Sequence, residues 1–407
     1  MPNSRRRILF TTALGHFNVD VIASMVPILL AHLSRAFHLS NAQIGLAVLS
    51  YTAVSALSQP VFGFFADRIG GRLLATLGVL WCGAWMAVAG FAPSYALLVP
   101  ALMLAGLGSG AYHPQGAVRA ALAASGQRGI ATSIFFLGGG LGFAVGPLVG
   151  AQLLAAQGPH IAGWVVLICL PVAWLVWQAF GDEKKPAGAA TPRATSARSW
   201  SWLAAAPVLP ILTVLLSQGL RAGVMDSFNA YVPKFYLDRG FAPAQYGLIT
   251  SVVLIGASAG GLIGGYLSDR WNKKVVLSGG LLLATPLAYA FFHSGPETRL
   301  LLGFLTGLCL SAPFTPAMLL IQGLMPNRLS TITGLALTFF FLAGGVGTSL
   351  TGVLADRIGL AQAMNVSAAA IGLAALISLL VPLRLTATHR AAPAPASSSP
   401  LSAEENG

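Results

Sequence analysis

Long runs of apolar residues recur along this chain and restrict it to a membrane fold. A helix needs about 20 apolar residues to cross the hydrocarbon core of a bilayer. We find about twelve runs of this kind, near 8–34, 41–66, 73–92, 95–118, 129–156, 160–180, 207–236, 243–268, 275–294, 299–325, 329–355 and 361–384. Prolines interrupt the fourth and tenth runs. A membrane barrel would instead show alternating segments of about ten residues, so the runs predict an all-α polytopic membrane protein.

The few charged residues are distributed unevenly along the chain. They make up 8% of the 407 residues, against roughly 25% in soluble domains. Most of the 23 lysines and arginines fall on the same side of the membrane as the N-terminus, among them Arg5, Arg6 and Arg7, and fewer, such as Arg35, fall on the other side. The positive-inside rule then predicts a multi-pass protein of a bacterial inner membrane with both termini in the cytoplasm. Because topology accounts for the net charge of +12, we expect no nucleic-acid partner.

Two ionisable residues, His16 and Asp20, interrupt the first apolar run. A carboxylate at the bilayer centre costs about 2.5–3.5 kcal/mol on insertion scales, so such residues usually face a protein interior or an aqueous cavity. The two residues are four positions apart, which places them on one face of a helix. We interpret them as a proton-coupling pair. The alternative is a structural pair that steadies a helix interface.

The two halves of the chain resemble each other. Ala42–Leu46 recurs as Ala244–Leu248, and Phe135–Gly142 recurs as Phe340–Gly347. When the halves are aligned, Asp226 falls opposite Asp20, so it joins the proton-coupling candidates. Internal repeats are common in secondary transporters. We predict two pseudo-symmetric six-helix bundles, at 1–180 and 207–385.

Polar segments separate and follow the predicted bundles. Residues 181–206 contain acids, lysines, arginines, prolines and serines, a composition typical of a solvated linker. Residues 386–407 are rich in Ala, Pro and Ser, so we predict a disordered cytoplasmic tail.

Six helices, a linker and six more helices resemble the arrangement of the major facilitator superfamily. The segment from Gly63 to Arg72, between the second and third runs, is similar to the loop signature of that superfamily, and Gly265 to Lys274 is a degenerate second copy. The resemblance implies a conformational latch made by Gly63, Asp67, Arg68, Arg72, Asp269 and Arg270. A glycine permits close helix approach, and a carboxylate can face a helix N-terminus.

A third copy of part of this signature lies after the eleventh run. Ala355-Asp356-Arg357-Ile358-Gly359 repeats Ala66–Gly70 letter for letter. The predicted topology places it on the outer side of the membrane. We therefore interpret it as a turn and not as another latch.

The fourth run carries a histidine next to a proline. Gly106 to Gln115, together with His16 and Asp20, is similar to the fosmidomycin-resistance group of proton-coupled exporters. His113 and Pro114 match that group, whereas Gln115 stands where a glutamate is common. Pro114 removes a backbone donor and should weaken the helix beside His113. We take His113 and Gln115 as candidate substrate contacts, with a structural histidine as the alternative for His113.

Arg221 is the one basic residue that the predicted spans place deep in the membrane. It could bind a substrate carboxylate, phosphonate or phosphate, or it could neutralise an acid of the other half. Arg221 and Asp226 are five positions apart and do not share a helix face. Three further polar residues complete the candidate substrate contacts: Asn18, Asn229 and Tyr231.

These features predict a secondary active transporter, a proton-coupled antiporter that exports a small drug-like or anionic molecule by alternating access. The alternative is a proton-coupled symporter that imports a small organic anion or a metal-chelate. The deep polar residues form no nucleophile–base set and no metal-ligand spacing, so we expect no enzyme activity, cofactor or metal. We expect a monomer whose partners are the substrate, protons and the bilayer.

Overall fold

A computed structural model describes residues 3–123, 128–181, 208–325 and 329–382 of the chain. The predicted linker, apart from Gly181, and the predicted tail lie outside these residues. The described part is helical and contains no strand, which confirms the all-α class.

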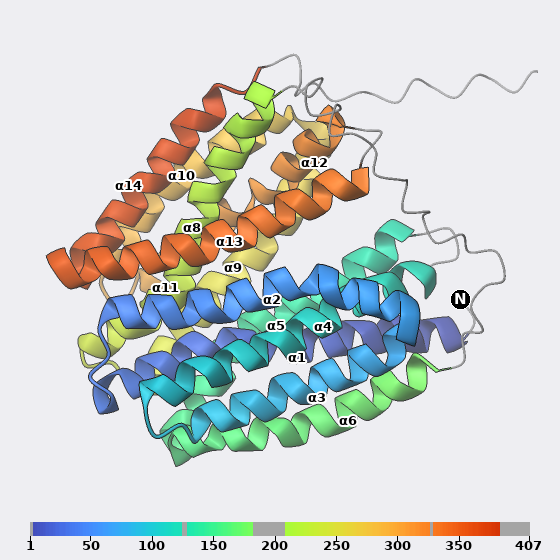
Figure 1. Cartoon of the computed structure of the whole chain (residues 1–407). Helices are drawn as coiled ribbons and strands as arrows, with labels where there is room; N and C mark the ends of the chain where they lie inside the picture. The colour runs from blue at the N-terminus through green and yellow to red at the C-terminus, as the bar shows by residue number, and fades with distance from the viewer. Residues whose placement is uncertain (1–2, 124–127, 182–207, 326–328, 383–407) are drawn as a thin grey trace, which may run out of the picture.

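The helices form two groups (Figure 1). The first group contains α1 (Asn3–Ala36), α2 (Asn41–Ile69), α3 (Gly71–Gly90), α4 (Tyr95–Ala123), α5 (Arg128–Gln157), the short 3₁₀ helix η1 (Pro159–Trp164) and α6 (Val165–Ala179). The second group contains α8 (Val208–Asp238), α9 (Pro243–Arg270), α10 (Lys273–Phe292), α11 (Arg299–Ser311), α12 (Phe314–Leu324), α13 (Leu329–Ile358) and α14 (Leu360–Leu379).

Length and composition allow 11 of the described helices to cross a membrane, if α11 and α12 are taken together as Arg299–Leu324. The remaining apolar helix, α6, is shorter because η1 occupies the start of the run expected at 160–180. Large apolar side chains such as Leu209 and Leu380 lie exposed on the outside, as expected for residues that contact lipid. The chain is a multi-pass membrane protein.

Prolines affect the two interrupted spans differently. Helix α4 continues through Pro100 and Pro114, whereas the tenth span breaks into α11 and α12 at Ala312 and Pro313. Proline in a helix interior loses a hydrogen bond and clashes with the carbonyl one turn earlier. Pro316 falls in the first turn of α12, where the missing N–H costs little.

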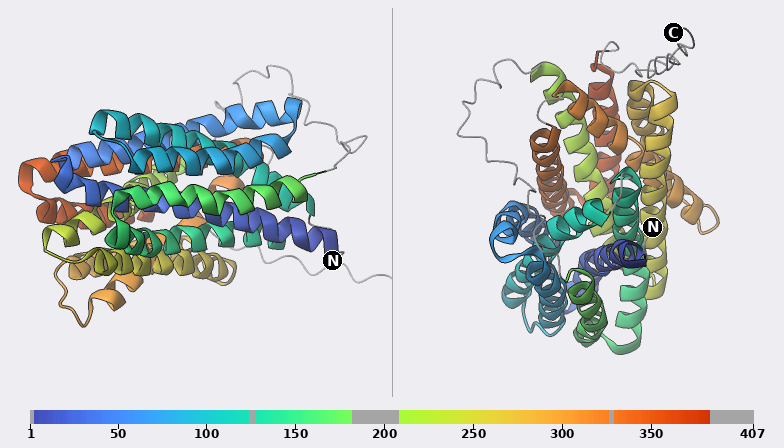
Figure 2. Two further views of the ribbon diagram at one scale, coloured as in Figure 1. Left: turned by 90° about the horizontal axis from the view of Figure 1, so that it is seen from below. Right: turned by 90° about the vertical axis from the view of Figure 1, so that its right-hand side faces the viewer.

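The two bundles meet mainly through two helix pairs, α2 with α13 and α5 with α9, and through a smaller contact between α1 and α8. Hydrogen bonds between the bundles gather toward the end where α1 is followed by α2 and α8 by α9, as between Arg35 Nη2 and Leu237 O at 2.8 Å. We call this the joined end. Toward the opposite end, where the chain begins, α2 and α13 draw apart (Figure 1), and we call it the separated end. The right-hand view of Figure 2 looks from the separated end toward the joined end and shows the second bundle stacked on the first.

Glycines explain how α5 packs against α1. A side chain at Gly138 would collide with Ala13 O, and one at Gly142 would collide with Phe17 O. Small residues of this kind let helix backbones approach closely within membranes. The glycine-rich stretch of α5 therefore fixes the helix that carries His16 and Asp20.

Candidate functional site

Asp20 of α1 lies between two histidines. Its Oδ2 is 3.3 Å from Nε2 of His16, and its Oδ1 is 3.3 Å from Nε2 of His113 on α4. The contact between His16 and Asp20 was predicted from their spacing. The contact with His113 was not, because α1 and α4 are brought together only by packing.

The second ring nitrogen of each histidine is bound to a backbone carbonyl. His16 Nδ1 lies 2.8 Å from Phe135 O, and His113 Nδ1 lies 2.7 Å from Ser109 O. A carbonyl can only accept, so each Nδ1 carries the hydrogen, and the Nε2 of a neutral ring is then an acceptor. Both Nε2 lone pairs therefore face a carboxylate oxygen unless a proton or another cation lies between them.

Aromatic packing holds the His16 ring in place. The ring stacks on Phe135 with centroids 4.0 Å apart, and it meets the His113 ring edge-on at 4.8 Å. A side chain at Gly139 of α5 would collide with the His16 ring and with the Asp20 carboxylate. The cluster is therefore held by α1, α4 and α5, while the side chains of Asp20 and His113 stay 15% and 23% exposed.

The ligand atoms of His16, Asp20 and His113 lie within 4.8 Å of one another. This arrangement has the atom types and spacing to share one small cation, so the expectation of no such set among the deep polar residues has to be corrected. Sequence spacing missed it because one of the three residues comes from another helix.

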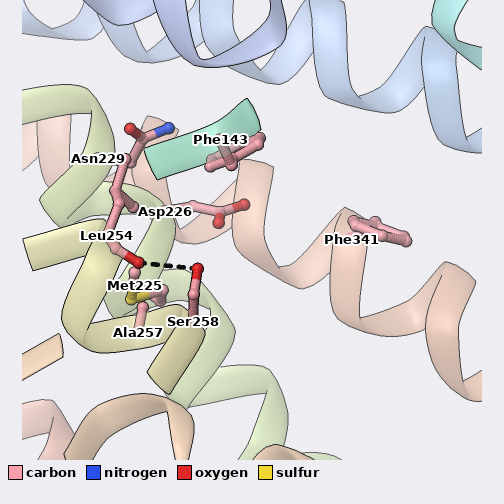
Figure 3. A pocket seen from close by; sticks show the side chains of 8 residues that line it. All are labelled: Phe143, Met225, Asp226, Asn229, Leu254, Ala257, Ser258 and Phe341. Carbon is pink, nitrogen blue, oxygen red and sulfur yellow. Dashed lines mark hydrogen bonds between the residues drawn. The ribbon is translucent and has the colours of Figure 1, made fainter. Parts of the chain in front are cut away.

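Asp226 of α8 lines a cavity of about 300 Å³ between the bundles. Phe143 is contributed by the first bundle, and the other lining residues come from the second: Met225, Asp226, Asn229, Leu254, Ala257, Ser258 and Phe341 (Figure 3). Oδ1 of Asn229 is buried without a partner among the described residues. A side chain at Gly344 would collide with the Asp226 carboxylate, which repeats the relation between Gly139 and Asp20.

Arg221 lies buried one and a half turns before Asp226 on α8. Its Nε donates to Oε1 of Gln218 at 2.6 Å, and its guanidinium lies 5.5 Å from the Phe314 ring. Within the described residues no carboxylate oxygen comes within 4.0 Å of Arg221. Gln218 Nε2 is also buried without a partner there. This pair leaves hydrogen-bond donors available for an anion.

Comparison with known proteins agrees with this architecture. The sequence model of the Major Facilitator Superfamily matches residues 8–242 and 214–405. The chain belongs to the Major Facilitator Superfamily. It is therefore a transporter and not an enzyme.

Relatives in this superfamily differ in the molecules they are named for. The chain is 28% identical to the fosmidomycin resistance protein of Escherichia coli (strain K12), over 86% of each chain. It is 26% identical to a probable 4-methylmuconolactone transporter of Cupriavidus pinatubonensis, over 87% of this chain and 83% of the relative. A bacterial homolog of the human lysosomal transporter Spinster, solved in an inward-facing and occupied conformation, shares the fold with a TM-score of 0.82 and 17% identity, over 97% of this chain and 100% of that one.

Of the six predicted substrate contacts, Asn229 lines the cavity of this facilitator, and the other five are not among its described lining residues. Three of these five have hydrogen bonds elsewhere. Asn18 Oδ1 accepts from Cys169 Sγ at 3.4 Å, and the Gln115 amide donates to Phe62 O at 3.4 Å, both inside the first bundle. The Tyr231 hydroxyl lies 2.9 Å from Asn41 O and 3.0 Å from Thr348 O at the joined end. Their hydrogen bonds indicate packing roles in this conformation, and substrate contact by these three residues stays a prediction. Periodicity could not separate these packed faces from the cavity face.

The superfamily loop signature makes no close helix contact through its glycine here. No described atom would lie within 4 Å of a side chain at Gly63, so among the described residues the expected close approach is absent at this position. Arg68 and Arg270 lie over the Phe64 and Tyr266 rings of their own helices. Three signature residues remain: Arg72 donates to Trp177 O at 2.7 Å, Asp269 is exposed, and the Asp67 side chain lies outside the described part.

The third copy of the signature makes the contact that was predicted for the first. Asp356 accepts hydrogen bonds from the backbone N–H groups of Asn41 and Ala42 at the start of α2. Gly359 has a positive φ of 86°, so a turn is present as predicted. The interpretation of this segment as a turn alone is wrong, because the joined end places a helix N-terminus of the other bundle beside it.

Proposed function

We propose that this protein exports a small drug-like or anionic molecule in exchange for protons, by alternating access across a bacterial inner membrane. The observation that carries the proposal is the position of Asp20 between the Nε2 atoms of His16 and His113. Asp226, at the matching place in the other half, lines the cavity between the bundles.

The hydrogen bonds of the two histidines favour proton binding by this cluster. With both Nδ1 hydrogens committed to carbonyls, neutral rings present lone pairs to the Asp20 carboxylate. A proton on either Nε2 or on the carboxylate turns that repulsion into a hydrogen bond. The partial exposure of Asp20 and His113 gives water and protons access, which proton relays in membrane transporters require.

Sidedness follows from the charges. We place the separated end in the cytoplasm, because it is the end at which the chain begins and the predicted basic segments fall there. The joined end then faces outward, and the described conformation is open to the cytoplasm. The solved homolog of the same fold has also been captured facing inward.

The substrate contacts in this proposal come from the second bundle. The Arg221 guanidinium, braced by Gln218, suits a carboxylate, phosphonate or phosphate group, and Asn229 offers an unpartnered amide oxygen at the cavity. The names of the relatives are compatible with small polar or anionic cargo. His113 acts with Asp20 on the proton in this proposal.

Protons and substrate alternate at the cavity. The cluster is protonated when the protein opens outward and releases its proton when it opens inward, where the substrate enters. Each proton moving down the membrane potential supplies about 2.3 kcal/mol per 100 mV, enough for a several-tens-fold substrate gradient.

Transport in proteoliposomes tests the proposal, with fosmidomycin as the probe and a pH-sensitive dye in the lumen. For an antiporter, an acidic lumen should drive the probe inward while protons leave. For a symporter that imports a small organic anion or a metal-chelate, an acidic exterior should drive the probe inward together with protons. Asp20→Asn should abolish gradient-driven accumulation, and Asp238→Asn, which changes an acid at the helix end, should not. Accumulation by Asp20→Asn at the wild-type level would refute the assignment.

A further inference from the structure

Asp356 joins the two bundles through the first turn of α2. Its Oδ1 accepts from Asn41 N at 2.8 Å and from Asn41 Nδ2 at 3.0 Å, and its Oδ2 accepts from Ala42 N at 2.9 Å. Asp356 belongs to the last turn of α13, in the second bundle. One carboxylate of the second bundle therefore takes three donors of the first.

The start of α2 is incompletely capped by its own residues. Ser40 Oγ accepts from Gln43 N at 3.2 Å, and Gln43 Oε1 accepts from Ser40 N at 2.9 Å. A helix begins with N–H groups that lack partners within the helix, and this capping box leaves those of Asn41 and Ala42. Asp356 takes both. A carboxylate at a helix N-terminus is also favoured by the helix dipole.

Further contacts hold the start of α2 at Asn41. The Tyr231 hydroxyl of α8 lies within hydrogen-bond distance of Asn41 O and Thr348 O. A side chain at Gly352 would collide with Asn41 O, and one at Gly45 would collide with the Tyr231 hydroxyl. Helices α2, α8 and α13 therefore converge on the residue whose N–H groups Asp356 binds.

The repeat supplies an internal comparison at the crossing of α5 and α9. In the aligned halves, Pro243 stands where Asn41 stands, and Ala151 stands where Asp356 stands. Proline has no N–H to donate, and alanine has no acceptor. That crossing is held by small-residue packing, with Gly247 against Ala151, and by Leu148 N donating to Ser251 Oγ at 2.9 Å. The Asn41 donors and the Asp356 acceptor are thus present at one crossing and have no equivalent at its counterpart.

We propose that Asp356 is a positioning residue for transport, a latch that sets how often the joined end is closed. When the bundles part at this end, the hydrogen bonds from Asn41 N and Ala42 N to the Asp356 carboxylate break. Water must then take the place of the lost partner at each group. Losing the carboxylate should therefore favour opening at the joined end. The inference rests on the alternating access in the proposed function, and it is independent of proton coupling.

Distance measurements between spin labels test this latch in the full-length protein. Labels at His38→Cys and Glu297→Cys report the joined end from the two bundles, because both residues are exposed in loops there. The native Cys82, Cys169 and Cys309 are replaced by serine. Asp356→Ala should raise the population of the longer distance by about threefold to tenfold, the range expected for losing a helix-capping acceptor. Asp356→Asn should give a smaller shift.

Matched variants make the outcome decisive. Asn41→Pro removes two of the three donors, Asn41 N and Nδ2, and leaves Ala42 N; proline is well tolerated at the first helical position. It should shift the distances in the same direction as Asp356→Ala but by less, and the double variant should add little to Asp356→Ala. Arg357→Gln, at the neighbouring exposed residue, should leave the distances unchanged. Wild-type distances in both Asp356→Ala and Asn41→Pro, or additive effects of the two, would overturn the latch. The shift should persist in an Asp20→Asn background, so failure of proton coupling alone would leave this result intact.

Discussion

Asp20 Oδ1 and His113 Nε2 lie 3.3 Å apart, across the contact between α1 and α4. Because His113 Nδ1 is bound to the Ser109 carbonyl, this pair is complete only when a cation, such as a proton, lies between the two atoms. The packing of α1 against α4 therefore creates the pair that binds the proton in the proposed transport mechanism.

His113→Gln should uncouple transport from the proton gradient. Glutamine retains polarity but cannot carry the proton that the pair requires. Accumulation driven by a pH gradient should fall by about tenfold or more, in the range of a lost proton-transfer group, while substrate counterflow without a gradient continues. Parallel measurements of both fluxes check this. His293→Gln is the matched control, because His293 makes the same Nδ1 contact to a carbonyl four residues earlier but is exposed at the end of α10. Loss of both fluxes together would argue against a specific role in coupling.

Gly139→Ala and Gly344→Ala should damage the two halves in parallel. Each added methyl group meets the carboxylate of the acid in its own bundle. Overpacking of a dense interior costs about 1–3 kcal/mol, so both variants should unfold at a lower temperature than the wild type in detergent. Gly279→Ala is the control, because no atom of the described part of the chain lies within 4 Å of a side chain there. Unfolding temperatures of the two variants equal to that of the control would contradict the packing described for the acids.

Arg221→Gln should weaken the binding of anionic substrates. Hydrogen bonds to charged groups contribute about 1.5–3 kcal/mol, so the apparent affinity should fall by roughly tenfold to a hundredfold. Arg221→Lys should recover only part of it, because lysine keeps the charge but lacks the planar fork of donors. Competition of transport by small carboxylates and phosphonates measures the effect. Equal inhibition of the wild type and Arg221→Gln would show that the guanidinium does not contact the anion.

Removal of divalent metals should leave transport unchanged. The proton is the cation that the proposal assigns to His16, Asp20 and His113. Purified protein should contain less than one equivalent of zinc by elemental analysis, and a chelator should not alter the flux. Inhibition by the chelator, reversed by one added equivalent of metal, would reassign the cluster.

The sequence by itself determined the features that depend on local properties. Apolar run length decides whether a segment can cross a bilayer, so the membrane-spanning helices could be placed from composition. Of the two runs that prolines interrupt, the tenth is broken and the fourth is a continuous helix. Helical periodicity decides which residues share a face, so the pairing of His16 with Asp20 could be predicted.

Only the tertiary structure decided which helix faces meet and at which end the bundles touch. Packing brought His113 to Asp20 and turned Gln115 and Asn18 into the first bundle, because a helix with polar residues on several faces does not reveal which face is packed. The segments at Ala66–Gly70 and Ala355–Gly359 have identical sequences, yet at the second a carboxylate caps a helix of the other bundle. The physical reason is that a carboxylate binds a helix N-terminus only when one lies within reach, and the relative placement of the two bundles sets that distance.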